Sequence, residues 1–143
     1  MTNDSATLEA RLAFARAWTG GSPYYERMGI SIDDLGEGRA LLRLTVAAHH
    51  LNADGIVHGG VLPALADAAM GSAARTLHGE VAQLLTIESN LRYFKPASGG
   101  ALLAEARVAK PGRRVAAMDV EIRDEAGAML ARGGGSFLIQ WRD

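Results

Sequence analysis

One segment of the chain, residues 61–74, is apolar on every side except for a single carboxylate, Asp67. A helix without a polar face belongs in the interior of a domain, so the rest of the chain has to surround it. A carboxylate there must pair with a cation, take up a proton or serve chemistry, because burying it unpaired costs several kcal/mol. The nearest cation along the segment, Arg75, comes eight residues later. Asp67 is therefore the first candidate for a functional residue.

Composition narrows the classes of protein that this chain can form. With 143 residues, 48% of them hydrophobic, the chain is long enough for one domain with a real core. A net charge of −1 argues against nucleic acid or an anionic membrane as a partner. The absence of cysteine excludes disulfides, thiolate metal sites and a cysteine nucleophile. The polar, acidic start of the chain and the lack of an apolar run of membrane-spanning length predict a cytoplasmic protein.

Before the apolar segment, the pattern predicts two helices and two strands. The first helix is expected from about residue 4 to 18, ended by Gly20 and Gly21. Ser22 and Pro23 then have the form of an N-cap followed by a first-turn proline, which predicts a short helix that ends near Gly29. Alternating apolar residues predict strands from residue 30 and over residues 40–46.

After the apolar helix, expected to end near His78, the pattern predicts a four-strand antiparallel meander. In its first strand, Leu85, Ile87, Leu91 and Tyr93 are expected on one face and Thr86 on the other. The inward residues of the next three strands are predicted to be Leu102, Ala104, Ala106, Val108, Ala116, Met118, Val120, Ile122, Phe137, Ile139 and Trp141. The run Gly133–Gly135 predicts a bulge or a close approach of another backbone. A single sheet can hide an apolar helix only by curling around it.

The predicted helix combines small residues with its one acid. Gly60, Ala64, Asp67, Gly71 and Ala74 share one face, which leaves room for a ligand or a partner backbone. His58, Gly59 and Gly60 put N–H groups at the helix start, where they suit an oxygen that becomes negative during a reaction. Amide donors and a carboxylate, without metal or cysteine, indicate acyl transfer to water. Gly60 and Asp67 are roughly 10 Å apart along the axis, so the acid comes from another helix or the substrate lies along this one.

Residues 52–60, with the form N-x-x-G-x-x-H-G-G, are followed by an acid nine residues after the histidine and then by T-I-E-S-N-L-R-Y-F-K-P-A. Together these motifs resemble hotdog-fold acyl-CoA thioesterases, most closely the phenylacetate-degradation type, whose helix acid is Asp. The resemblance covers about residues 22–140. It implies an α+β hotdog fold, in which a curved antiparallel sheet is wrapped around a long central apolar helix. Residues 1–143 would then form one thioesterase domain, with residues 1–21 as an N-terminal helical extension.

The resemblance also implies roles for individual residues at the reacting centre. The Gly59 amide would polarise the thioester carbonyl, and Asp67 of the other subunit would act as base or nucleophile. Asn52 and His58 would line the thioester. Thr86 occupies the position where the family has Ser or Thr that orients the attacking water.

Binding of the substrate and assembly of the protein are implied in the same way. Gly60, at the helix mouth, is expected to contact the substrate, and Lys95, Arg113 and Arg114 the phosphates of coenzyme A. The family implies a homodimer that pairs into a dimer of dimers, an acyl-CoA substrate, and no cofactor or metal. Pro63 departs from the family pattern and is expected to alter the first turn of the helix.

Other functions stay open at this point. A hydratase or dehydratase on the same fold would use an acid and a histidine, for which Asp54 and His58 are available. A non-catalytic acyl-CoA-binding protein would keep the fold without turnover. Asp67 could instead be a structural acid, and Arg113 and Arg114 simple turn charges. The histidines at 49, 50 and 58 fit no zinc spacing and are interpreted as solvated loop residues.

Overall fold

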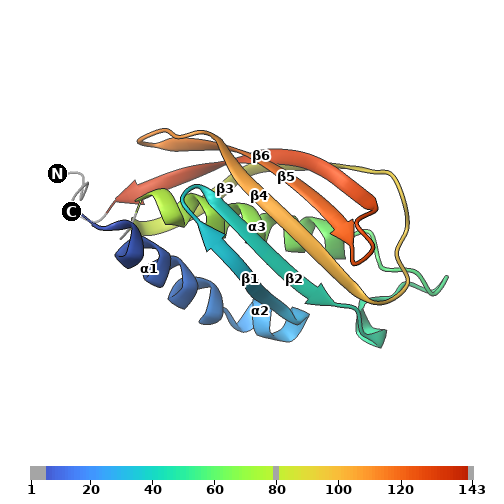
Figure 1. Ribbon diagram of the computed structural model, residues 1–143. Helices are drawn as coiled ribbons and strands as arrows, with labels where there is room; N and C mark the ends of the chain where they lie inside the picture. The colour runs from blue at the N-terminus through green and yellow to red at the C-terminus, as the bar shows by residue number, and fades with distance from the viewer. Residues whose placement is uncertain (1–5, 79–80, 142–143) are drawn as a thin grey trace.

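The computed structural model describes residues 6–78 and 81–141. Three α-helices, one short 3₁₀ helix and six strands follow one another along the chain (Figure 1). Their bounds are α1 Leu8–Gly20, α2 Pro23–Met28, β1 Ile30–Gly36, β2 Arg39–Thr45, η1 Ala48–His50, α3 Val61–His78, β3 Val81–Tyr93, β4 Ala101–Lys110, β5 Val115–Asp124 and β6 Met129–Trp141. None of these helices, within the described residues, is long and apolar enough to cross a membrane.

All six strands form one antiparallel sheet in the order β1-β2-β4-β5-β6-β3. The predicted four-strand meander is therefore wrong, although β4, β5 and β6 do follow one another. β3 pairs with β6 at one edge of the sheet, and the chain then returns to place β4 beside β2. Alternating patterns say which residues face the core, but they do not say which strands are neighbours.

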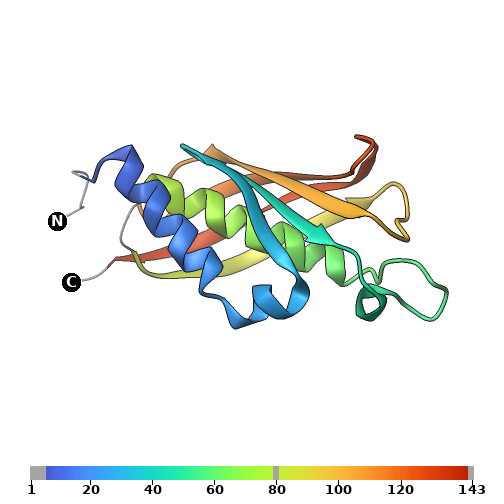
Figure 2. The same cartoon turned by 60° about the horizontal axis from the view of Figure 1, so that its bottom comes forward.

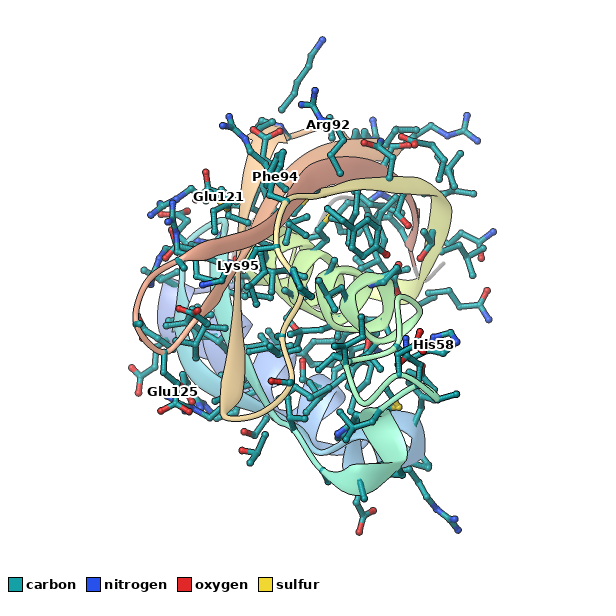
Figure 3. The ribbon with its side chains drawn as sticks, turned by 90° about the vertical axis from the view of Figure 1, so that its right-hand side faces the viewer. His58, Arg92, Phe94, Lys95, Glu121 and Glu125 are labelled. Atoms are coloured by element: carbon teal, nitrogen blue, oxygen red, sulfur yellow. The ribbon has the colours of Figure 1, made fainter. Side chains whose placement is uncertain are left out.

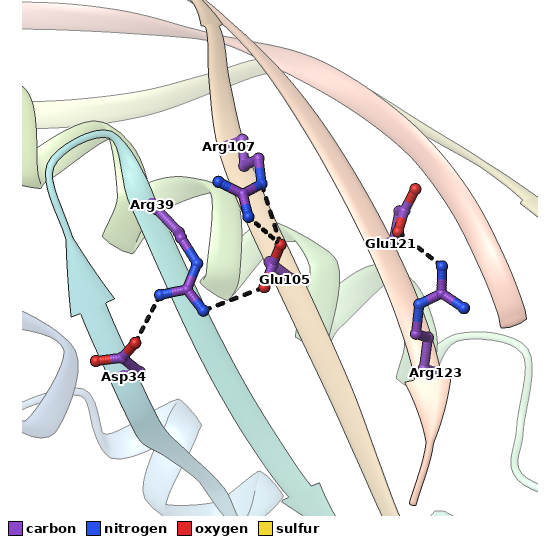
Figure 4. A network of polar contacts seen from close by, with 6 residues as sticks. All are labelled: Asp34, Arg39, Glu105, Arg107, Glu121 and Arg123. Carbon is purple, nitrogen blue, oxygen red and sulfur yellow. Dashed lines mark hydrogen bonds and ion pairs between the residues drawn. The ribbon is translucent and has the colours of Figure 1, made fainter. Parts of the chain in front are cut away.

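The sheet curls around α3, as predicted (Figures 1 and 2). Along α3, Val61, Leu62 and the apolar residues from Leu65 to Ala74 are buried, and the predicted inward residues of β4, β5 and β6 face them. Ala40, Leu42 and Leu44 of β2 complete this core with no exposed surface. The opposite face of the sheet is polar. Figure 4 shows Arg39 bridging Asp34 and Glu105 there, with N–O distances of 2.6 and 3.2 Å.

Helix α1 covers the side of α3 that the sheet leaves open (Figure 2). A Cβ on Gly71 would lie 3.3 Å from the Trp18 ring, and the Arg75 guanidinium lies 4.2 Å from the centroid of that ring. Burial lowers the pKa of Arg75 to about 10. Thr19 and Ser72 share a buried hydrogen bond of 2.6 Å. The small-residue face of α3 is therefore closed over its second half, and only the half with Ala64 and Asp67 is partly open.

The bounds of α1 and α2 can be compared directly with the starts and ends predicted for the first two helices. α1 begins at Leu8, with the Thr7 hydroxyl as its cap, and it continues to Gly20. It therefore ends two residues later than predicted, and the expected start near residue 4 lies outside the described residues. For α2 the prediction is confirmed, since Ser22 caps it, proline opens it, and Gly29 ends it with a φ of 72°.

Strand β3 contains a bulge that changes which side chains face α3. Thr86 pairs with Phe137 and Glu88 with Ser136, so Ile87 is an extra residue without a partner of its own. Paired residues share a face of the sheet, and Phe137 is buried, so Thr86 faces inward. Leu85 and Ile87 are 43% and 55% exposed. The prediction that Leu85, Ile87, Leu91 and Tyr93 share one face is therefore wrong.

Gly133, Gly134 and Gly135 mark a close approach of three strands. A Cβ at Gly133 would collide with the carbonyl oxygen of Asn90 in β3, and one at Gly134 with the carbonyl oxygen of Met118 in β5. The prediction of close backbone approach is confirmed. The bulge in this region lies in β3 and not in the glycine run itself.

Candidate active site

The loop before α3 is built around Asn52. Its Oδ1 accepts from the N–H groups of Asp54 and Ile56, at 2.9 and 3.3 Å, and so closes a tight turn. Gly55 supplies the positive φ, 77°, that this turn requires. A single bridge between Leu51 and Val57 holds the base of the loop. The amide nitrogen Nδ2 of Asn52 has no hydrogen bond among the described residues, so it is an available donor.

His58 satisfies two of the amides at the start of α3. Its Nδ1 accepts from the Gly60 N–H at 2.8 Å, and its carbonyl accepts from the Val61 N–H at 2.9 Å. The Gly59 N–H forms no hydrogen bond within the described part of the chain. Of the three amides from 59 to 61, Gly59 alone keeps a free donor. Pro63 lies in the first turn, where it removes an N–H that has no intrahelical partner.

A cavity of about 350 Å³ opens beside this loop. Most of its lining is apolar or aromatic, from Ile56, Val57, Leu62, Tyr93, Phe94, Pro96 and Ala97. Asn52 and Lys95 contribute polar side chains, and Gly59 contributes backbone. Figure 3 looks onto this end of the molecule, where His58 and Lys95 arrive from different segments. The exposed Lys95 ammonium lies 3.8 Å from the Asp124 carboxylate. We call Asn52, His58, Gly59, Gly60 and Lys95 the mouth cluster.

Asp67 lies farther along α3, with Thr86 of β3. The Thr86 hydroxyl donates to Asp67 Oδ1 at 2.7 Å, and no cation pairs with this carboxylate among the described residues. Asp67 is partly exposed rather than buried as predicted, although Ala66 and Ala68 on either side of it are buried. Thr86 can reach Asp67 because the bulge at Ile87 turns it inward. We call Asp67 and Thr86 the acid cluster.

Tyr25 of α2 lies near the acid cluster. Burial and then the negative charge of Asp67 raise the pKa of Tyr25 to about 12, so its hydroxyl stays protonated. Its ring packs edge-on against Trp18 with centroids 6.2 Å apart. Sequence analysis missed Tyr25, because no motif connects α2 to residue 67.

The two clusters do not meet within one chain. Gly59 lies in the turn two residues before α3 begins, and Asp67 lies in the second turn of the helix. Eight residues at the helical rise correspond to a separation on the order of 12 Å along the helix axis. A carbonyl bound at Gly59 is therefore out of reach of the same chain's carboxylate. Each chain therefore carries the mouth cluster and the acid cluster at separate places, one before α3 and one within it.

Arg113 and Arg114 lie far from the mouth cluster. They occupy the turn between β4 and β5, whereas Lys95 precedes the other end of β4. Ten residues of β4 separate these ends, roughly 30 Å of extended strand. One chain therefore does not bring Lys95 and these arginines to the same ligand.

The loop histidines differ from one another. His50 is 2% exposed, so its interpretation as a solvated residue is wrong. Its Nδ1 accepts from the Ala47 N–H, and its Nε2 donates to the Met28 carbonyl, both at 2.8 Å. This buried ring ties the loop to α2. His49 and His58 are exposed, as expected. Asp54 forms no hydrogen bond or ion pair with His58 within the described residues.

Comparison with known proteins shows the family of this chain. Residues 54–131 match the thioesterase superfamily. The chain belongs to the thioesterase superfamily. It is 33% identical over 115 residues to the acyl-coenzyme A thioesterase PaaI of Escherichia coli, covering 75% of this chain and 79% of PaaI. Membership in this superfamily makes the chain a thioester hydrolase.

Two solved structures of similar proteins agree with the fold. The E. coli PaaI protein from the phenylacetic acid degradation operon aligns with a TM-score of 0.85 and 26% identity, over 94% of this chain and 96% of that one. The conserved protein PA5202 of Pseudomonas aeruginosa aligns with a TM-score of 0.81 and 35% identity, over 85% and 97%. The predicted hotdog fold and the resemblance to the phenylacetate-degradation type are confirmed.

Proposed function

We propose that this thioesterase hydrolyses an acyl- or aryl-CoA thioester to a free acid and coenzyme A. The free N–H of Gly59, at the wall of the cavity beside the helix start, is the observation that carries this proposal. A thioester carbonyl entering the cavity can accept a hydrogen bond from it. The same donor becomes more effective as negative charge develops on that oxygen.

Asp67 of a second copy supplies the other half of the reaction. Its carboxylate takes a proton from water that Thr86 helps to orient, and the water attacks the polarised carbonyl carbon. Alternatively the carboxylate attacks directly and forms an anhydride that water then cleaves. In both routes the C–S bond breaks and coenzyme A leaves as a thiolate that takes up a proton. Asn52 Nδ2 is a further donor toward the thioester.

The shared site requires a homodimer, and β3 offers the surface for it. β3 is an edge strand of 13 residues. Its residues Leu85, Ile87 and Tyr93, and Phe94 directly after it, leave large apolar surfaces exposed. Long apolar edges of this kind pair with another strand. A twofold axis near Ser89 and Asn90, midway between Thr86 and Tyr93, would bring the acid cluster of one copy to the mouth cluster of the other.

We expect the protein to be at least a dimer at assay concentration, measured by sedimentation. Asp67→Asn and the double variant Asn52→Ala/His58→Ala should each be inactive alone. After subunit exchange, mixed dimers hold one intact site, so activity should return to about a quarter of the wild-type value. An active monomer, or no recovery in demonstrably mixed dimers, would contradict the shared site.

Phosphates of coenzyme A are proposed to contact Lys95 of one copy and Arg113 and Arg114 of another. Lys95 and the two arginines lie at opposite ends of β4, so they can reach the same nucleotide only if they come from different copies. A dimer of dimers would bring further copies to the same nucleotide.

A thiol-release screen over aryl, short, medium and long acyl-CoA substrates tests the proposed activity. We expect free coenzyme A to form with more than one turnover per subunit. A binding protein would release none beyond the first equivalent. A hydratase would remove the conjugated absorbance of crotonyl-CoA without releasing thiol. The missing contact between Asp54 and His58 favours hydrolysis over hydration.

A further inference from the structure

The peptide between Gly59 and Gly60 is held by a side chain at each of its two polar ends. Tyr93, the last residue of β3, donates from Oη to the Gly59 carbonyl oxygen at 2.6 Å. On the other end, the Gly60 N–H donates to His58 Nδ1 at 2.8 Å. Both the carbonyl and the N–H of this peptide are thus hydrogen-bonded, and the two bonds together fix the orientation of the peptide plane.

These hydrogen bonds matter because packing does not hold Gly59. A Cβ built on Gly59 would have no neighbouring atom within 4 Å, while one on Gly60 would approach His58 Nδ1 at 3.2 Å. Glycine has wide backbone freedom, and here no contact restricts it. The direction of the Gly59 N–H therefore depends on the hydrogen bonds of the adjacent peptide.

Tyr93 is well suited to this task and is not needed for the core. Its side chain is 51% exposed, so the ring contributes little to buried packing. Burial of the hydroxyl end raises the pKa of Tyr93, which keeps the donor protonated. Although the residue as a whole is half-exposed, its hydroxyl bonds to a loop carbonyl.

Resting on the function proposed above, we propose that Tyr93 is a positioning residue for thioester hydrolysis. With His58 it clamps the Gly59–Gly60 peptide, so that the Gly59 N–H stays directed at the substrate carbonyl. These two hydrogen bonds orient the Gly59 N–H, and they are not themselves contacts with the substrate. Loss of the Tyr93 hydroxyl should therefore weaken stabilisation of the transition state more than binding of the ground state.

Tyr93→Phe tests this role, because it removes Oη and leaves the ring. We expect kcat to fall about tenfold, with KM within about twofold and with an unchanged melting temperature. Tyr24→Phe is the matched control. Tyr24 is 53% exposed and its hydroxyl has no hydrogen bond among the described residues, so its kcat should equal that of the wild type.

A spectroscopic measurement separates positioning from a merely structural role. An isotope-labelled thioester bound to the Asp67→Asn variant should show a lowered carbonyl stretching frequency, because the Gly59 N–H polarises it. Adding Tyr93→Phe should move that frequency back toward its value in solution, while adding Tyr24→Phe should not.

Two groups of outcomes would overturn the clamp. A wild-type kcat in Tyr93→Phe, a raised KM with normal kcat, or an unchanged carbonyl frequency would each remove the positioning role while hydrolysis itself stands. Absence of thioester hydrolysis by the wild-type protein would instead remove the proposed function, and the clamp with it.

Discussion

Asp67→Asn is expected to lower the rate of thioester hydrolysis by roughly a hundredfold or more, since the base or nucleophile is lost. The fold should remain, because Asn is nearly the same size and its Oδ1 can still accept from the Thr86 hydroxyl. No cation loses a partner, so the free energy of unfolding should stay within about 1 kcal/mol of the wild-type value or rise. Steady-state thiol release and thermal unfolding measure the two quantities.

Asp54→Asn is the control for this experiment. Asp54 is exposed in the loop before α3, and only its backbone N–H takes part in the turn around Asn52. Its substitution should leave hydrolysis unchanged. A structural role for Asp67 predicts the reverse pattern for Asp67→Asn, with early melting and normal turnover in the protein that stays folded. That result would make the assignment of Asp67 wrong.

Gly133→Ala should lower the free energy of unfolding by about 3 kcal/mol, at the upper end of what overpacking costs. The new methyl group would collide with the Asn90 carbonyl of β3, and backbone cannot move aside as a flexible side chain can. Relief requires β3 and β6 to separate, and β3 carries Thr86. Denaturant unfolding measures the loss, and we expect thiol release to fall with it.

Gly20→Ala provides the contrast. A Cβ there has no neighbour within 4 Å, and the residue lies in the last turn of α1. Alanine is the better helix former by up to about 1 kcal/mol, so stability should be equal or higher. Equal stability of Gly133→Ala and the wild type would show that β3 and β6 do not approach as closely as described.

The elements, and the inward faces of β4, β5 and β6, could be predicted from the sequence, because one residue pattern determines each of them; the face of β3 could not, because alternation does not reveal the bulge at Ile87. The apolar run around Asp67 indicated a central helix, and alternation indicated the buried residues of β4 and β5. The order of the strands could not be predicted, because the partner of β3 depends on contacts between residues distant in sequence. The same holds for the position of Trp18 over Gly71, which closes half of the small-residue face.

The site was predictable only as a set of motif residues. The H-G-G run and an acid nine residues after its histidine indicated which residues to examine. Their separation into a mouth cluster and an acid cluster follows from the helix geometry that the sequence already implies. The contacts of Tyr25 and Tyr93 needed the structure, since each joins segments that no short motif connects.

Because of the bulge at Ile87, the number of residues in β3 matters as much as which residues they are. Thr86 and Tyr93 are seven residues apart, so in an unbroken strand their side chains would point to opposite faces. The extra residue lets both face α3, where one supports the acid and the other the glycine loop. Deleting or inserting one residue between them would withdraw one of the two supports, even with every named residue retained. Exposed loops tolerate such changes in length, but this exposed strand should not.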